Sequence, residues 1–396
     1  MLTYKSNIKP IYFDNNASTP LDPLIFEEML PFFKENFGNP HSTSHAIGWS
    51  AAKAVETAAG SIATLIGCDL DEVFFTSGAT ESNNIAIAGL ARGHTSNKRK
   101  IVTTEIEHKS TINICRSLED EGFETVFTPV DNNGRILLDQ LFQNLNEDVL
   151  ICSFSAVNSE IGTIQEIDRV SDIARSFGVL MHWDAAQAPG IFSLQKFSEH
   201  TDLISLSAHK MYGPQGIGAI RIAREIQPFI KPLIQGGGQQ DGIRPGTLST
   251  ALCVGMGHAA RIAGDDDLQQ INRTRISNLR NRLVEGLTSA YPSIRLNGPD
   301  YQIRHSGNAN ICFPGINGED ILAVLQPRLA ASTGSACTSG IPEPSHVLRG
   351  IGLSQNEASS SVRFCLGRFS NEGEVEIAIE LISNAIDQFE TIRDVG

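Results

Sequence analysis

The chain of 396 residues lacks the features of several broad protein classes. No apolar run reaches the roughly 20 residues of a membrane-spanning helix, so we expect no membrane contact. The start of the chain carries no apolar signal core, and cytoplasm is the expected location. Positive charge is scarce, with 31 Lys and Arg against 45 Asp and Glu and a formal net charge of −14. This balance argues against direct, sequence-independent binding of nucleic acid.

Cysteine is present, but in no pattern that indicates a disulfide or zinc framework. The seven cysteines are odd in number, and none shows Cys-x-x-Cys spacing. Most are predicted to be small buried hydrophobic residues. Internal repeats and low-complexity segments are also absent. The remaining composition, 41% hydrophobic and 19% charged, is that of a globular protein with room for a large core and a smaller domain.

Strand-like apolar segments alternate with helical patterns between residues 60 and 225. This alternation predicts an α/β fold with a mostly parallel central sheet covered on both faces. After residue 256, long helical stripes and two strands predict a smaller α+β domain, which part of the extended N-terminus joins. We therefore expect a large domain at 15–255 and a small domain formed by 1–14 with 256–396. The expected strands are 72–76, 100–103, 124–127, 149–153, 179–183, 203–206, 216–222, 308–313 and 361–364.

Lys210 stands alone among the lysines in its apolar, Gly-rich setting. It follows the apolar run 201–206 and precedes the turn 211–218. Burial of an unpaired ammonium is costly, and desolvation lowers the pKa of an amine, which can then attack a carbonyl and form a Schiff base. From this segment alone, a lysine that caps a loop is an equally good interpretation.

Asp184 ends a second buried segment, 178–183, where a parallel sheet places its ligand sites. A carboxylate there can keep the pyridine nitrogen of pyridoxal phosphate protonated, or it can simply cap the next helix. His108, just past another strand, can stack on a cofactor ring or move a proton, although a lone strand-end histidine is more often structural. Asn158 and Gln187 are further strand-end amides.

A run of small residues, Phe75 to Ser82, leads from a strand into a helical pattern. Such a turn lets backbone N–H groups approach a phosphate at a helix start, and an ordinary capping turn is the alternative. Cys337 lies in a second run of small residues, 331–340, which predicts a mobile, exposed loop suited to a travelling thiol nucleophile. Arg363 interrupts an apolar strand, which indicates either a carboxylate ligand or a structural ion pair.

Together these motifs resemble the cysteine desulfurases of the NifS/IscS type, in the long-loop group of the class V aminotransferases, over almost the whole chain. The resemblance implies pyridoxal-phosphate fold type I, the aspartate-aminotransferase type, with a large cofactor-binding domain. The small domain would carry the catalytic cysteine loop, at about 331–342. The segments that carry the resemblance are Phe13–Pro20, Phe37–Ser42, Thr76–Asn83, Val157–Gly162, Asp184–Gln187, Ser207–Gly213, Arg244–Thr247 and Gly334–Ser339.

The resemblance also implies roles for individual residues. Lys210 would carry the cofactor, His108 would stack on its ring and relay protons, and Asp184 would pair with the pyridine nitrogen. Cys337 would take the sulfur of L-cysteine as a persulfide, while Arg363 would bind the substrate carboxylate. Further contacts would come from Gln187 and Asn158 at the ring oxygen, Ala79, Thr80, Ser207 and His209 at the phosphate, Thr247 across a dimer interface, and Asn15 or Asn158 beside Arg363.

The implied reaction is release of L-alanine and transfer of sulfur to an acceptor or scaffold protein by a homodimeric sulfurtransferase. Iron–sulfur cluster assembly is the default pathway, and in related enzymes the cysteine at the Cys337 position can help to ligate a transient iron–sulfur cluster. Three positions, Ala208, Ser159 and Thr333, depart from the housekeeping pattern, but none has an assigned catalytic role. The chain also ends soon after its last helix, without the docking tail of the housekeeping form, so the acceptor stays open.

Five alternatives remain at this point. A dedicated nitrogenase system or DNA phosphorothioation through a partner would keep the same chemistry. A selenocysteine lyase or an aminotransferase would use the same fold, although an aminotransferase has no use for the Gly334–Ser339 motif. A non-catalytic sulfur-relay scaffold is opposed by the intact Lys210, Asp184 and Cys337.

Overall fold

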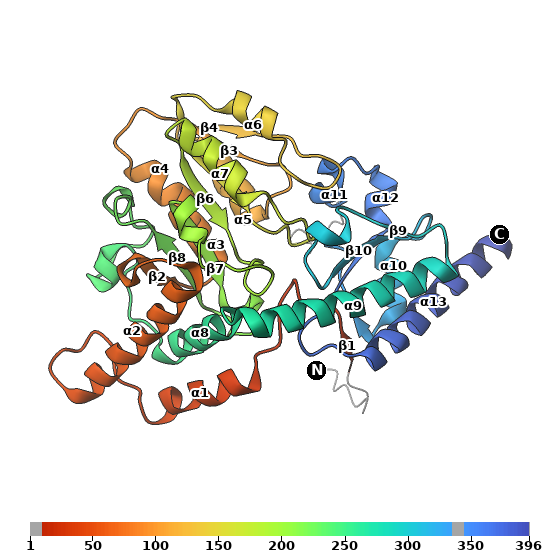
Figure 1. Ribbon diagram of the computed structural model, residues 1–396, viewed down its shortest axis with the longest axis horizontal. Coiled ribbons are helices and arrows are strands. Elements are labelled where there is room, and N and C mark those ends of the chain that lie inside the picture. Colours follow the sequence, from red (N-terminus) through yellow and green to blue (C-terminus); the bar gives the residue numbers. More distant parts are fainter. Residues whose placement is uncertain (1–9, 335–343, 396) are drawn as a thin grey trace.

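A computed structural model describes residues 10–334 and 344–395 of the chain. Figure 1 shows two bodies of unequal size joined by a long helix, α9 (Asp266–Ala290), which runs from the larger body into the smaller one. Among the described residues, no helix is long and apolar enough to cross a bilayer.

The larger body is built on a seven-stranded sheet in the order β2-β8-β7-β6-β5-β3-β4. All neighbours pair in parallel except those of β8, which runs antiparallel to both β2 and β7. The mostly parallel sheet expected from the sequence is therefore confirmed. Its strands are β2 (Val73–Thr76), β3 (Lys100–Thr103), β4 (Glu124–Phe127), β5 (Val149–Ser155), β6 (Leu180–Asp184), β7 (Leu203–Ser207) and β8 (Gly218–Ile222).

Helices cover both faces of this sheet, so its central strands are apolar on both sides. Phe74 and Phe75, neighbours on β2, enter two different cores because successive side chains of a strand point to opposite faces. The helices are α1 (Pro23–Lys34), α2 (Ala46–Ile66), α3 (Ala79–Asn84), the π-helix η2 (Ile85–Gly89), α4 (Leu90–Gly93), α5 (Lys109–Glu119), α6 (Leu138–Asn144), α7 (Ile167–Ser176) and α8 (Thr250–Ala263).

The smaller body packs helices on two small sheets. β9 (Arg295–Leu296), β10 (Asn308–Cys312) and β12 (Ser361–Cys365) are antiparallel, and β1 (Ile11–Tyr12) pairs in parallel with β11 (Leu329–Ala330). Its core contains Ile11 and Phe13 of the extended N-terminal segment. Its further helices are α10 (Gly318–Leu325), α11 (His346–Gly350), α12 (Gln355–Ser359) and α13 (Glu372–Val395).

The expected division of the chain at residues 255 and 256 falls inside α8. The last turns of this helix belong to the larger core through Ala259, Ala260 and Ala263, and α8 packs mainly on α2, which small residues let it approach closely. Four polar residues named from the sequence lie at or just beyond the carboxyl ends of β3, β5, β6 and β7. In that order they are His108, Asn158, Asp184 and Lys210. A parallel sheet binds its ligands at this edge.

Candidate active site

Lys210 ends a short 3-10 turn, η4 (Ala208–Lys210), that follows β7. Its Nζ donates to the backbone carbonyls of Asn16 at 2.5 Å and Ala17 at 2.8 Å. Burial lowers its pKa to about 8, and the nearby Arg363 guanidinium acts in the same direction. A lysine amine in this position loses its proton far more readily than one in water, as Schiff-base chemistry requires.

The segment Asp14 to Thr19 follows β1 of the smaller body and holds the Lys210 turn of the larger body in place. Beyond the two carbonyls on Lys210, the Thr19 N–H and hydroxyl donate to the His209 carbonyl at 2.8 Å and 3.0 Å. The Thr19 hydroxyl in turn accepts the Tyr212 N–H at 2.8 Å. Tyr212 has a φ of 66°, which a side chain rarely adopts. Several fixed contacts therefore offset the strain beside the lysine.

Asp184 is buried at the end of β6. Its Oδ1 accepts the backbone N–H of Ala186 at 3.0 Å, and its Oδ2 accepts the Asn83 amide at 2.7 Å. Both bonds fix the carboxylate in one orientation, which suits a partner for a ring nitrogen.

His108 is the N-cap of α5, where its Nδ1 accepts the backbone N–H of Ser110 at 3.1 Å. Part of the ring is exposed, yet the surrounding protein desolvates it and lowers its pKa, while the Asp184 charge acts in the opposite direction. The charge of Lys210 also reaches His108. Lys210 and Asp184 therefore both lie close enough to His108 for their charges to act on its ring.

The residues expected at a phosphate lie at the start of α3 and beyond β7. Gly78, the N-cap of α3, has a φ of 154° that favours glycine, and a Cβ there would meet open space. Thr80 is exposed, whereas Ser207 is buried at the end of β7. His209 lies 3.2 Å from the Ser18 hydroxyl, and burial lowers its pKa to about 4, so its ring is neutral. Ala79 is partly exposed at the first position of α3.

Thr247 is exposed on the single chain, near Arg244. Arg244 pairs with Glu81 of α3 through Nε and Oε1 at 2.9 Å. This ion pair ties the Thr247 segment to the helix that begins at Ala79.

The amides named from the sequence are engaged with the backbone. Gln187 donates to the Asn16 carbonyl at 2.9 Å. Asn158 donates to the Ile106 carbonyl and accepts two backbone N–H groups, while Asn15 donates to the Cys365 carbonyl at 2.9 Å. In this structure the Asn15 and Asn158 side chains therefore fix backbone segments.

Arg363, on β12, is buried and paired. Its Nη2 lies 2.7 Å from Asp14 Oδ1 and 2.7 Å from the Ser332 hydroxyl, and its Nη1 donates to the Ser159 carbonyl at 3.1 Å. The anionic partner that the sequence required for a charge in an apolar strand is thus Asp14 in this structure. Arg363 Nε has no partner among the described residues.

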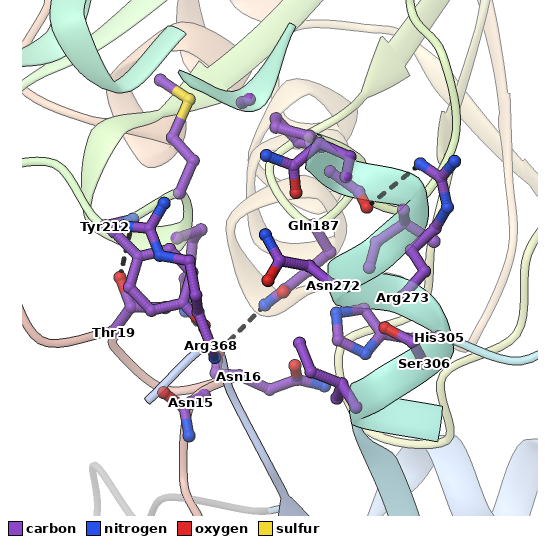
Figure 2. A pocket seen from close by; sticks show the side chains of 18 of the residues that line it. Asn15, Asn16, Thr19, Gln187, Tyr212, Asn272, Arg273, His305, Ser306 and Arg368 are labelled. Carbon is purple, nitrogen blue, oxygen red and sulfur yellow. Dashed lines mark hydrogen bonds between the residues drawn. The ribbon is translucent and has the colours of Figure 1, made fainter. Parts of the chain in front are cut away.

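A cavity of about 60 Å³ adjoins Lys210 at the junction of the two bodies. Figure 2 shows polar side chains that meet there from three directions: Asn15 and Asn16 of the N-terminal segment, Gln187 beyond β6, and Asn272 of α9. A cavity of this size and polarity has room for a few ordered water molecules.

The six cysteines of the described residues are poor nucleophiles. Burial raises the pKa of each thiol, to about 12 for Cys365, which lies near Lys210 and donates to Asn16 Oδ1 at 2.8 Å. Cys337 lies outside the described residues. Within the described residues, no group of three or more His, Cys, Asp or Glu is placed to hold a metal ion.

Sequence reasoning missed three side chains that support the site: Asn83, Asp14 and Asn16. Asn83 was detectable as a polar, weak helix former next to the apolar helical run 85–90. Asp14 and Asn16 gave no comparable signal, because their side-chain partners lie at least 143 positions further along the chain.

Comparison with known proteins gives the family. Residues 11–377 match Aminotransferase class-V. The chain belongs to the class V aminotransferase family. A protein of Rickettsia bellii named cysteine desulfurase IscS is 43% identical over 98% of this chain and 93% of its own length. A solved structure titled NIFS-LIKE PROTEIN superposes with a TM-score of 0.87, at 33% identity, over 97% of this chain and 100% of its own.

A second solved structure, titled SspA in complex with cysteine, has a TM-score of 0.79 and 33% identity over 91% of this chain and 100% of its own. These similarities confirm the NifS/IscS-type resemblance and pyridoxal-phosphate fold type I. The cofactor of the enzyme is pyridoxal 5'-phosphate. The residues around Lys210 fit this group chemically, because a low-pKa amine, a fixed carboxylate and an imidazole ring meet there.

Proposed function

We propose that the chain is a cysteine desulfurase that converts L-cysteine to L-alanine and passes the sulfur to an acceptor protein. The observation that carries this proposal is the meeting of Lys210, whose pKa is about 8, with the Asp184 carboxylate and the His108 ring in a class V chain. The names of the relatives point to the same activity.

Lys210 would hold the cofactor covalently until L-cysteine replaces it. The bound cofactor supplies an electron sink. Asp184 would hold the proton of the pyridine nitrogen, and His108 would lie on the ring and move a proton. The remaining cofactor contacts would come from Ala79, Thr80, Asn158, Gln187, Ser207 and His209, and from Thr247 of a second subunit.

Cys337 would accept the sulfur atom. Its thiolate attacks the sulfur of the substrate, a new S–S bond forms, and the Cβ–S bond breaks. The electron pair of the broken bond passes to Cβ, which takes up a proton to become the methyl group of L-alanine. The buried thiols of the other cysteines have raised pKa values, which supports Cys337 in this role because the thiolate is the reactive form.

Arg363 would read the substrate carboxylate, with help from Asn15 or Asn158. The Asp14 carboxylate is chemically equivalent to the carboxylate of L-cysteine, so the substrate would take the place of Asp14 on the guanidinium. Ser332, which bonds both Arg363 and Asp14, lies close in sequence to Cys337.

The proposed working unit is a cytoplasmic homodimer. Its persulfide would go to an acceptor or scaffold protein for iron–sulfur cluster assembly. Cys337 would then also be the candidate ligand for a transient iron–sulfur cluster.

Replacement of Cys337 by serine tests the proposal. The variant should bind pyridoxal phosphate and still change its absorption when L-cysteine is added, but it should release no alanine, because an alcohol does not attack sulfur here. Cys312→Ser and Cys365→Ser are the controls and should keep persulfide formation. Mass spectrometry after one turnover locates the extra sulfur. A label on another cysteine, or turnover by Cys337→Ser, would overturn the mechanism.

A further inference from the structure

Asn83 is a fully buried amide on α3 that joins two parts of the site. Its Nδ2 donates to Asp184 Oδ2 at 2.7 Å and to the Ser110 hydroxyl oxygen at 3.0 Å. A carboxylate only accepts hydrogen bonds, so the amide must present its nitrogen to Asp184. Both N–H groups of Asn83 are then used, and its Oδ1 has no partner among the described residues.

The same contact limits the direction of the Ser110 hydroxyl. Its oxygen already accepts from Asn83 and lies 2.8 Å from His108 Nδ1. Among the described residues, no acceptor other than this ring nitrogen is within hydrogen-bond distance of the hydroxyl. The Ser110 O–H therefore points at Nδ1.

The backbone gives the second constraint on His108. The Ser110 N–H also donates to Nδ1, at 3.1 Å. A nitrogen that accepts from an N–H carries no proton of its own, so the proton of the neutral ring must be on Nε2. Backbone and hydroxyl thus favour the same tautomer.

We propose that Asn83 and Ser110 are positioning residues that hold His108 as the neutral tautomer with its proton on Nε2. The chain of hydrogen bonds runs from Asp184 through Asn83 and Ser110 to His108. It therefore fixes the His108 ring relative to the Asp184 carboxylate. The catalytic consequence rests on the proposed function: the proton that His108 can give is the one on Nε2, and Nδ1 stays an acceptor.

Charged groups around His108 come from several elements. Asp184 at the end of β6 favours the imidazolium, whereas Lys210 beyond β7, His346 of α11 and Lys109 of α5 oppose it, and burial lowers the pKa further. Loss of the Ser110 donor removes a bond that the neutral ring makes. The pKa of His108 should therefore rise in variants of Asn83 or Ser110.

Nuclear magnetic resonance of the full-length enzyme labelled with ¹⁵N in its histidine rings reads the tautomer directly. Long-range proton–nitrogen correlations distinguish a ring nitrogen that carries a proton from one that does not, and His108→Gln identifies the signals. The wild type should show a protonated Nε2 and a bare Nδ1. Asn83→Ala and Ser110→Ala should raise the Nδ1–H fraction roughly two- to tenfold, the change expected from loss of one neutral hydrogen bond.

Asn144→Ala is the matched control. Asn144 also donates its amide to a hydroxyl, that of Thr128 at 3.0 Å, but on α6. This variant should keep the wild-type pattern. If Asn83→Ala does not fold, Ser110→Ala, at a partly exposed position, decides alone.

A wild-type ring protonated on Nδ1, or wild-type tautomers in Ser110→Ala, would overturn the proposal. The readout needs neither cofactor nor turnover. An enzyme that shows the expected tautomer but releases no alanine from L-cysteine would contradict the proposed function instead.

Discussion

Lys210 can react with a carbonyl only after its ammonium has lost a proton. An ordinary lysine keeps that proton up to a pH of about 10.4, whereas burial brings the pKa of Lys210 to about 8. We predict that the rate of pyridoxal phosphate addition to cofactor-free enzyme rises about tenfold per pH unit below pH 8 and levels off above it. Absorbance stopped-flow over this range measures the rate.

Lys53→Ala, which removes an exposed lysine in a surface ion pair, should give the same profile as the wild type. Lys210→Ala should give no cofactor bond that borohydride can trap. A rate that keeps rising past pH 10, or borohydride labelling of another lysine, would show that Lys210 is not the anchor.

Asp14 competes with the substrate carboxylate for the Arg363 guanidinium. Loss of a hydrogen bond to a charged group costs about 1.5–3 kcal/mol, so Arg363→Ala should lower kcat/KM for L-cysteine by one to two orders of magnitude. Asp14→Asn should lower KM several-fold, because the substrate no longer displaces a charged partner. Steady-state alanine release measures both variants.

Arg295→Ala is the control for that series. It removes an ion pair with Glu357 in the same body, but at an exposed site where such pairs contribute little. Unchanged kinetics in Arg363→Ala would leave Arg363 a structural partner of Asp14.

The residues that the sequence could identify are those with a local signal. Lys210, Asp184 and His108 each follow an apolar strand, so their positions at one sheet edge were predictable. The pairing of Arg363 with Asp14 was not, because 349 positions separate the two and a sequence pattern does not report which distant groups meet.

At the scale of elements, buried strands were predictable and short ones were not. β3 and β4 match their expected bounds. The buried β3 shows an apolar run because both of its faces are covered, whereas β4 is a partly exposed edge strand with β-branched and aromatic residues. The two-residue strands β1, β9 and β11 are too short to show a period. The π-helix η2 cannot be told from an α-helix in the sequence, since its apolar residues also fit a period of 3.6.

Arg304 joins elements of the two bodies, and no carboxylate of the described residues pairs with it. The buried guanidinium donates to the carbonyls of Ile161 at 2.9 Å and Asn297 at 2.6 Å, and to Asn308 Oδ1 at 3.0 Å. Arg304→Ala leaves these acceptors unsatisfied, at a cost of about 1–3 kcal/mol each. We predict that its thermal midpoint falls by roughly 5 °C or more, as calorimetry would measure.

Arg282→Ala tests whether any lost arginine has this effect. Arg282 pairs with Glu372 and Glu376 on the surface, and its loss should shift the midpoint by roughly 1 °C or less. Equal shifts in the two variants would show that the carbonyl contacts of Arg304 contribute nothing special to stability.

At the scale of the whole molecule, the single chain exposes large apolar side chains on α1, on the loop that follows it and on the first turn of α2, both helices being labelled in Figure 1. Phe37 is 72% exposed and Trp49 is 58% exposed. Monomers rarely leave a large apolar surface in water, so we place the proposed dimer contact on this part of the chain. Arg244 and Glu81 join the exposed Thr247 segment to the start of α3, which would couple assembly to phosphate binding.

We therefore predict that the enzyme sediments at twice its chain mass of 42.9 kDa. Trp49→Glu places a charge in the apolar contact, so it should shift the protein toward the monomer and weaken cofactor retention in parallel, because a residue supplied by the second subunit is lost. Ile271→Glu, at an apolar position of α9 that is 67% exposed, should change neither property. Analytical ultracentrifugation with absorbance detection of the cofactor follows mass and retention together. A monomer that keeps its cofactor and full activity would show that each chain holds a complete site, and Thr247 would then have no role across an interface.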